Sequence, residues 1–286
     1  MNPASTTSLT SLEETDKLLT KFEIDNIPAQ YREYYGIKRN NFFASIQGFP
    51  EMWQYYLRLD AVWMREFDDL KVRIDPNRLF PLILFFNAHA KMRMSIELAL
   101  CGCLSEARSI LRDAIEFVAH AHRLLSDPKL HIVWLSKRDG QIEEKAFKKA
   151  FEHNKKIGLF KGLDELHAKW KELSETGAHA NPLSICDRFV IKKLPDGGQE
   201  WGLKYCGVEL RVWGMSLFSF LLTCFVMEQT LFNDYESRLK LDSDLMRMRG
   251  EFEAYKEQLR QTIITGYKLK PPGGVQAAPR PTIYRP

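Results

Sequence analysis

Six polar side chains in the middle of the chain have the residue types and the spacing of a binding or catalytic site. They are His89, Arg93 and Glu97 in one segment, and Arg112, Glu116 and His120 in the next. Steps of four residues place each set along one face of a helix. Arginine binds anions, and glutamate and histidine exchange protons, so the two rows predict an anion-binding or acid–base site.

Two helices that fold back on each other would bring these rows together. We expect the helices at residues 76–101 and 105–126, because each segment carries an apolar seam with three- and four-residue spacing. Gly102 is predicted to end the first helix, and Ser105 to cap the second. The connection is short, which predicts an antiparallel αα-hairpin.

In such a hairpin the two rows are predicted to meet in three layers. The expected pairs are Glu97 with Arg112, Arg93 with Glu116, and His89 with His120. One interpretation is that the ionic pairs fix the register of the hairpin; breaking a buried pair of this kind costs roughly 3 to 5 kcal/mol. The other is that the row lines a pocket that binds an anion or carries out acid–base chemistry. A metal site is disfavoured, because both glutamates face arginines and the Glu-x-x-His element of di-iron bundles is missing.

A second group of candidates follows residue 172. Ser174, His179 and Asn181 lie where a predicted helix ends at Gly177 and Pro182. His179 suits the negative end of the helix dipole and would there have a structural role alone. Alternatively, the three side chains reach a pocket made by the αα-hairpin. The candidate catalytic residues are Arg112, Glu116, His120 and His179, and the candidate ligand-binding residues are His89, Arg93, Glu97, Ser174 and Asn181.

Composition and charge restrict the class of protein. The chain has 286 residues, of which 45% are hydrophobic, with 41 basic and 37 acidic residues. The net charge of +4 resides in residues 266–286, so residues 1–265 are formally neutral, which disfavours a broad nucleic-acid surface. The five cysteines include no CxxC pair, which disfavours a structural zinc site. The small, odd number of cysteines and the absence of a signal-peptide pattern at the start of the sequence favour a location in the cytoplasm. The apolar run Val212–Met227 is shorter than the roughly 20 residues of a membrane span and predicts a buried helix.

The predicted fold is mainly α: a helical bundle with a β-hairpin insertion near residues 186–206. The hairpin is expected because β-branched and aromatic residues flank the turn sequence Leu194-Pro-Asp-Gly-Gly198. Residues 1–10 are expected to be a disordered leader, 11–265 a single helical-bundle domain, and 266–286 a basic, Pro/Gly-rich disordered tail.

Two segments carry a resemblance to a known family. Ser109–Glu116 and Leu173–Asn181 resemble a group of uncharacterised bacterial helical domains that is distantly similar to the HEPN superfamily. The resemblance covers residues 81–232. The superfamily includes ribonucleases of toxin–antitoxin and phage-defence systems. By this resemblance, Arg112, Glu116 and His179 would lie near a shared site. Those enzymes have Arg and His four to six residues apart on one helix, whereas seven residues separate Arg112 from His120 here.

Together these features predict a cytoplasmic helical binding or interaction module in bacterial defence or regulation, whose partner is an unknown protein or a small-molecule ligand. The alternative is a metal-independent ribonuclease, with His120 or His179 as general base and Arg112 stabilising phosphate charge. No cofactor, metal ion or membrane is expected. RNA binding and homo-oligomer formation stay open.

Overall fold

A computed structural model describes residues 28–72, 78–151, 158–178, 188–203, 205–206 and 210–266. The mainly α-helical bundle predicted from the sequence is confirmed in these residues. The expected leader, the tail after residue 266, and the candidates His179 and Asn181 lie outside the described part of the chain.

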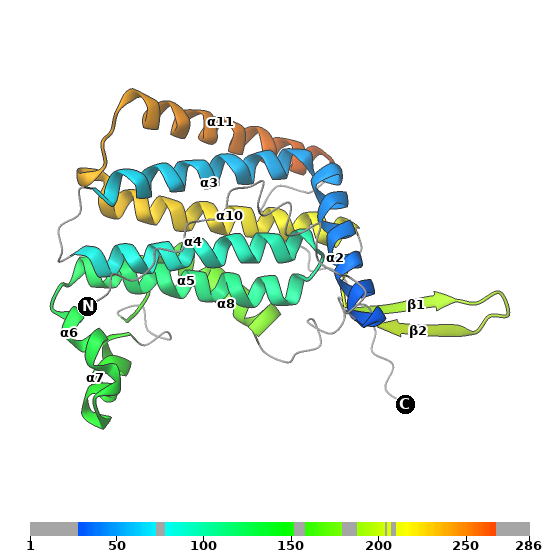
Figure 1. Ribbon diagram of the computed structural model, residues 1–286, viewed down its shortest axis with the longest axis horizontal. Coiled ribbons are helices and arrows are strands. Elements are labelled where there is room, and N and C mark those ends of the chain that lie inside the picture. The colour runs from blue at the N-terminus through cyan, green and yellow to red at the C-terminus, as the bar shows by residue number, and fades with distance from the viewer. Residues whose placement is uncertain are drawn as a thin grey trace, which may run out of the picture.

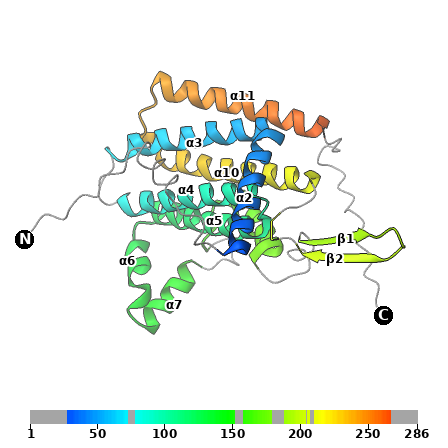
Figure 2. The same cartoon turned by 45° about the vertical axis from the view of Figure 1, so that its right-hand side comes forward.

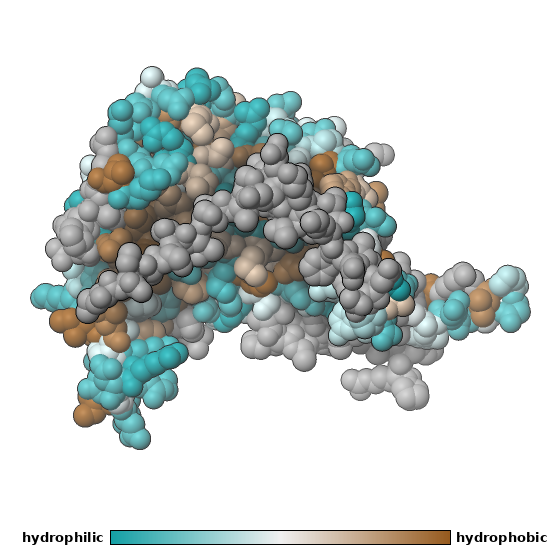
Figure 3. Space-filling model, in the orientation of Figure 1, coloured by the Kyte–Doolittle hydropathy of each residue, from teal (hydrophilic) through white to brown (hydrophobic). Residues whose placement is uncertain are grey.

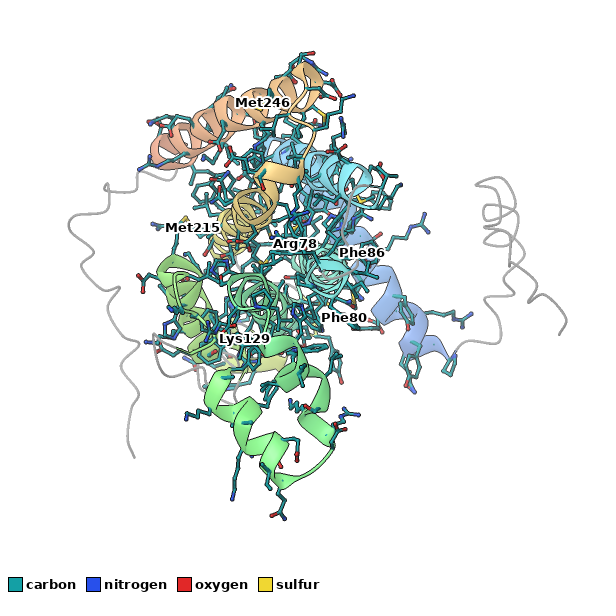
Figure 4. The ribbon with its side chains drawn as sticks, turned by 90° about the vertical axis from the view of Figure 1, so that its left-hand side faces the viewer. Arg78, Phe80, Phe86, Lys129, Met215 and Met246 are labelled. Carbon is teal, nitrogen blue, oxygen red and sulfur yellow. The ribbon has the colours of Figure 1, made fainter. Side chains whose placement is uncertain are left out.

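Among the residues that the structure describes, six long helices build the bundle. They are α2 (Ala29–Gly48), α3 (Pro50–Leu70), α4 (Leu79–Leu100), α5 (Leu104–Ser126), α10 (Leu210–Tyr235) and α11 (Ser243–Gly266). Figure 1 shows α3, α4, α5, α10 and α11 side by side, with α2 crossing one end of the bundle. Figure 4 views the bundle from the opposite end, where Arg78 precedes α4. There the Tyr235 hydroxyl of α10 donates a hydrogen bond to the Arg78 carbonyl oxygen over 3.1 Å.

Shorter elements surround the long helices. They are α6 (Leu130–Leu135), η3 (Ser136–Arg138), α7 (Gln141–Ala150), α8 (Asp164–Leu173), the π-helical turn η4 (Ser174–Ala178) and η5 (Glu236–Arg238). Figures 1 and 2 show α6 and α7 projecting from one end of the bundle. On the face shown in Figure 3, hydrophobic residues gather near that end. Ile132 of α6 is 76% exposed, so this apolar side chain has little cover from the bundle.

The predicted αα-hairpin is present as α4 and α5. Gly102 lies in the connection with a φ of 78°, the left-handed conformation that glycine adopts without steric cost. The two helices pack along a seam rich in small residues, among them Ala88, Ala99, Ala107 and Ala114, all fully buried. The expected cap at Ser105 is wrong: α5 begins at Leu104 after Cys103, and no side chain caps it within the described structure.

The apolar helix α10 lies in the core, against α3, α4, α5 and α8. Of the described residues, only this helix is long and apolar enough to cross a membrane by length and composition. It nevertheless carries the fully buried Glu228, which bonds to Arg249 of α11. Arg249 Nη1 also lies 2.7 Å from Glu66 Oε1 of α3. One arginine therefore joins buried carboxylates from two neighbouring helices.

Two short antiparallel strands form a hairpin outside the bundle. Strand β1 is Phe189–Lys193 and β2 is Gln199–Leu203, with Ile191 opposite Trp201. Gly197 in the turn has a φ of 83°. Figures 1 and 2 show the hairpin projecting from the end of the bundle at which α2 lies.

Candidate functional site

The predicted layers between α4 and α5 do not form, and the six polar residues separate into different sites. Arg93 bonds to Asp60 of α3, and Glu116 bonds to Arg112 on its own helix. His89 contacts α3 and His120 contacts the aromatic rings of Phe147 and Phe151. The pairings of Arg93 with Glu116 and of His89 with His120 are therefore wrong, and so is that of Glu97, which is exposed, with Arg112.

The error comes from the centre of the turn. Residues of an antiparallel helix pair lie level when they are equally distant in sequence from the turn. The turn is centred on Gly102, and Lys91 and Asp113, which are equally distant from it, lie level with Nζ 3.4 Å from Oδ2. The predicted pairs assumed a centre two to three residues later. That shift rotates each residue away from its expected partner.

Asp60 forms hydrogen bonds with two of the predicted ligand-binding residues. Arg93 donates from Nε to Oδ1 and from Nη2 to Oδ2, both over 2.7 Å, and His89 Nε2 lies 2.8 Å from Oδ1. Burial alone would raise the pKa of Asp60, but the hydrogen bonds from His89 and Arg93 hold it at about 2, below its usual value. The carboxylate is therefore ionised at neutral pH and fixes the direction of the Arg93 guanidinium.

Arg93 and Glu97 line a cavity of about 560 Å³ between α2, α3 and α4. We call this cavity the aromatic pocket, after the five rings in its wall. The rings belong to Tyr35, Phe42, Phe43, Trp53 and Tyr56, and the charged lining residues are Lys38, Arg39, Arg93 and Glu97. Because Asp60 balances Arg93, the remaining charge is that of Lys38 and Arg39 against Glu97. The pocket thus combines flat apolar walls with a net positive charge.

Three other candidates meet between α5 and α8. Arg112 Nη2 lies 2.8 Å from Glu116 Oε1, and Arg112 Nε donates to Ser174 Oγ over 2.9 Å. Ser174 is the first residue of the π-helical turn η4, which places its side chain beside α5. The Trp170 ring packs under the guanidinium at 4.9 Å, and its Nε1 donates to Glu116 Oε1 over 2.9 Å. Arg112 is therefore engaged by a carboxylate, a hydroxyl and an aromatic ring of the same chain.

A second cavity, of about 400 Å³, lies against α5, η3 and α7, and we call it the α5–α7 pocket. Glu116 and His120 line it, together with Lys137 and Arg138 of η3. Phe147 of α7 forms another wall and stacks on the His120 ring with 5.8 Å between centroids. The pocket brings a carboxylate, an imidazole and two cations to one cavity.

Asp60, Trp170, Lys137 and Arg138 were missed in the sequence. Asp60 had a visible signal, because it is an acid within the apolar stripe of Tyr56, Trp63 and Phe67. Lys137 and Arg138 had none, since a three-residue 3₁₀ turn has no periodic pattern.

The chain has no match among protein-family models, curated proteins or solved structures. Within the described ranges, no group of three or more His, Cys, Asp or Glu side chains is placed to hold a metal ion.

Proposed function

We propose that this protein is a ligand-binding module whose aromatic pocket takes a small organic anion with a flat ring, of the kind that a nucleoside monophosphate represents. The observation that supports this is the convergence of five aromatic side chains and three cations on one cavity. A volume of about 560 Å³ is within the range of small-molecule sites. Aromatic walls stack on planar groups, and cations attract the anionic part.

The Asp60–Arg93 pair explains how the pocket would hold an anion without a large entropic cost. Two hydrogen bonds fix Arg93 before any ligand arrives, so its rotamer entropy is lost on folding rather than on binding. Nε–H and one N–H of Nη2 bond to Asp60, and the other N–H groups of the guanidinium can then bond to an anion. Lys38 and Arg39 supply the charge that Asp60 does not balance.

Calorimetric titration with AMP, GMP and UMP, and with the uncharged nucleosides, tests this proposal. We expect saturable binding of at least one monophosphate and several-fold weaker binding of its nucleoside. Lys38→Ala should weaken binding by roughly five- to tenfold, the value of about 1 kcal/mol for one partly screened charge. The control is Lys171→Ala, which removes the same charge from an exposed position on α8. Failure of all three monophosphates to bind, or equal loss in both variants, would contradict the proposal.

A second candidate function, phosphodiester cleavage, is supported by the α5–α7 pocket. His120 can exchange protons there, and Lys137 and Arg138 can stabilise the charge that develops on a phosphate, whereas Glu116 is held by Arg112 and Trp170. The predicted scheme gave the phosphate to Arg112, but that side chain is held by Glu116 and Ser174. In the revised scheme the two η3 cations take this role.

Purified protein incubated with total RNA in EDTA tests the second candidate. Cleavage that His120→Ala abolishes and Lys171→Ala retains would support it, provided that circular dichroism shows both variants folded. RNA that stays intact under all conditions, or cleavage that persists in folded His120→Ala, would remove it. The cytoplasmic location and the role in bacterial defence or regulation stay predictions.

A further inference from the structure

Three buried thiols meet where the β-hairpin returns to the bundle. Cys101 and Cys103 flank Gly102 in the α4–α5 connection, and Cys206 follows strand β2. The Sγ atoms of Cys103 and Cys206 are 3.0 Å apart, although 103 residues separate them in sequence. Both side chains are reduced and less than 10% exposed. The fold has therefore brought two distant thiols to within the reach of a covalent bond.

We propose that Cys103 and Cys206 form a reversible disulfide, and that the oxidant is a small disulfide of the glutathione type. One protein thiolate attacks the glutathione disulfide, which yields a mixed disulfide and releases one glutathione. The second protein thiol then displaces the other glutathione. In total the protein thiols lose two protons and two electrons and gain one Sγ–Sγ bond, while one glutathione disulfide becomes two glutathione thiols.

Both sulfurs are buried, Cys206 at 7% and Cys103 at 4%, so the first attack requires a local opening of the chain. We expect that opening at Cys206, because the adjacent Tyr205 is 77% exposed. Burial, a hydrogen bond with Cys206 and the charge of that sulfur raise the pKa of Cys103 to about 12. Cys103 is therefore protonated at neutral pH, and it is expected to react only in the second step, with the mixed disulfide formed at Cys206. Oxidation is expected to be slow near neutrality and faster at higher pH.

The bond would fix the base of the hairpin to the α4–α5 turn beside the aromatic pocket. Tyr205 packs against Tyr34 of α2 with 6.0 Å between ring centroids. The same helix is tied to the turn, because Asn41 Nδ2 donates to the Cys101 carbonyl oxygen and Ser45 Oγ to that of Leu100. Cys101 itself lines the aromatic pocket. The disulfide would then hold hairpin and turn together at one edge of that pocket, and hydrogen bonds would hold α2 to the turn.

The experiment equilibrates the full chain with mixtures of reduced and oxidised glutathione at about pH 8, where thiol exchange is fast. Free thiols are then blocked with iodoacetamide, and the peptides are mapped by mass spectrometry. We expect a linked Cys103–Cys206 peptide lighter by two hydrogens, which dithiothreitol reverses, and a melting temperature several degrees higher in the oxidised protein. Cys101→Ser and Cys224→Ser should still form the link.

Two variants protect this test from a folding artefact. Cys206→Ser and Cys103→Ser should each abolish the linked peptide and the shift in melting temperature, and circular dichroism should show that each variant is folded. The proposal is overturned if the oxidised chain carries only glutathione adducts. It is also overturned if the linked peptide joins Cys101 to another cysteine, or if folded Cys206→Ser shows the same shift.

Discussion

Asp60→Asn removes the charge on which His89 and Arg93 converge while keeping the size of the side chain. The pKa of Asp60 is about 2, against an ordinary value of 3.8. A difference of this size corresponds to roughly 2 kcal/mol of stability for the ionised form. Little of this is lost to solvent screening, because the Asp60 side chain is only 20% exposed. We therefore expect Asp60→Asn to lower the free energy of unfolding by about 2 kcal/mol at neutral pH.

The sign of the pH dependence follows from the lowered pKa. A carboxyl group whose pKa is lower in the folded state stabilises it when ionised, so the contribution is complete above about pH 5 and is lost as the pH falls toward about 2. Urea denaturation of both proteins should give the full difference at neutral pH and roughly half of it near pH 3. Asp68→Asn is the control, because its exposed pair with Lys71 is worth little. Equal stabilities at neutral pH, or a difference that does not shrink in acid, would refute the reasoning.

Three further predictions concern other parts of the fold. Burial, together with the nearby charge of Glu228, raises the pKa of Glu66 well above its ordinary value of 4.5, so stability should fall as the pH rises from that ordinary value through the raised one; Glu66→Gln should flatten this fall in denaturation curves. Ser174→Ala removes the acceptor of Arg112 Nε and should cost about 1 kcal/mol, measured by chemical denaturation; an unchanged midpoint would contradict it. Gly102→Ala places a Cβ at a φ of 78° and should lower the free energy of unfolding by about 1 to 2 kcal/mol. Gly36→Ala, inside α2 with open space around it, is the control and should raise it by up to about 1 kcal/mol. The opposite order would contradict this explanation of the turn.

The αα-hairpin could be predicted because its determinants are local. The apolar spacing of residues 79–126 and the single Gly102 between the two helices are properties of consecutive residues. The partners of the polar row depend instead on the centre of the turn and on a third helix. A shift of two to three residues changed the pairs, and α3 supplied Asp60 from 33 positions before Arg93.

The candidate site shows the same limit. Arg112 and Ser174 meet across 62 residues of sequence, a contact that the spacing within neither segment specifies. Trp170, which contacts both Arg112 and Glu116, had no pattern that separates it from an ordinary aromatic of an amphipathic helix. Long-range contacts of this kind follow from the packing of whole elements, which periodicity does not specify.

The projecting β-hairpin has a consequence for how the protein loses its structure. An isolated pair of strands is only marginally stable in water, and the facing residues Ile191 and Trp201 are 51% and 60% exposed. Its backbone amides should therefore exchange with deuterated solvent through local opening, long before those of the buried α4–α5 seam. The outermost part of the chain can thus open and close many times during one lifetime of the folded bundle.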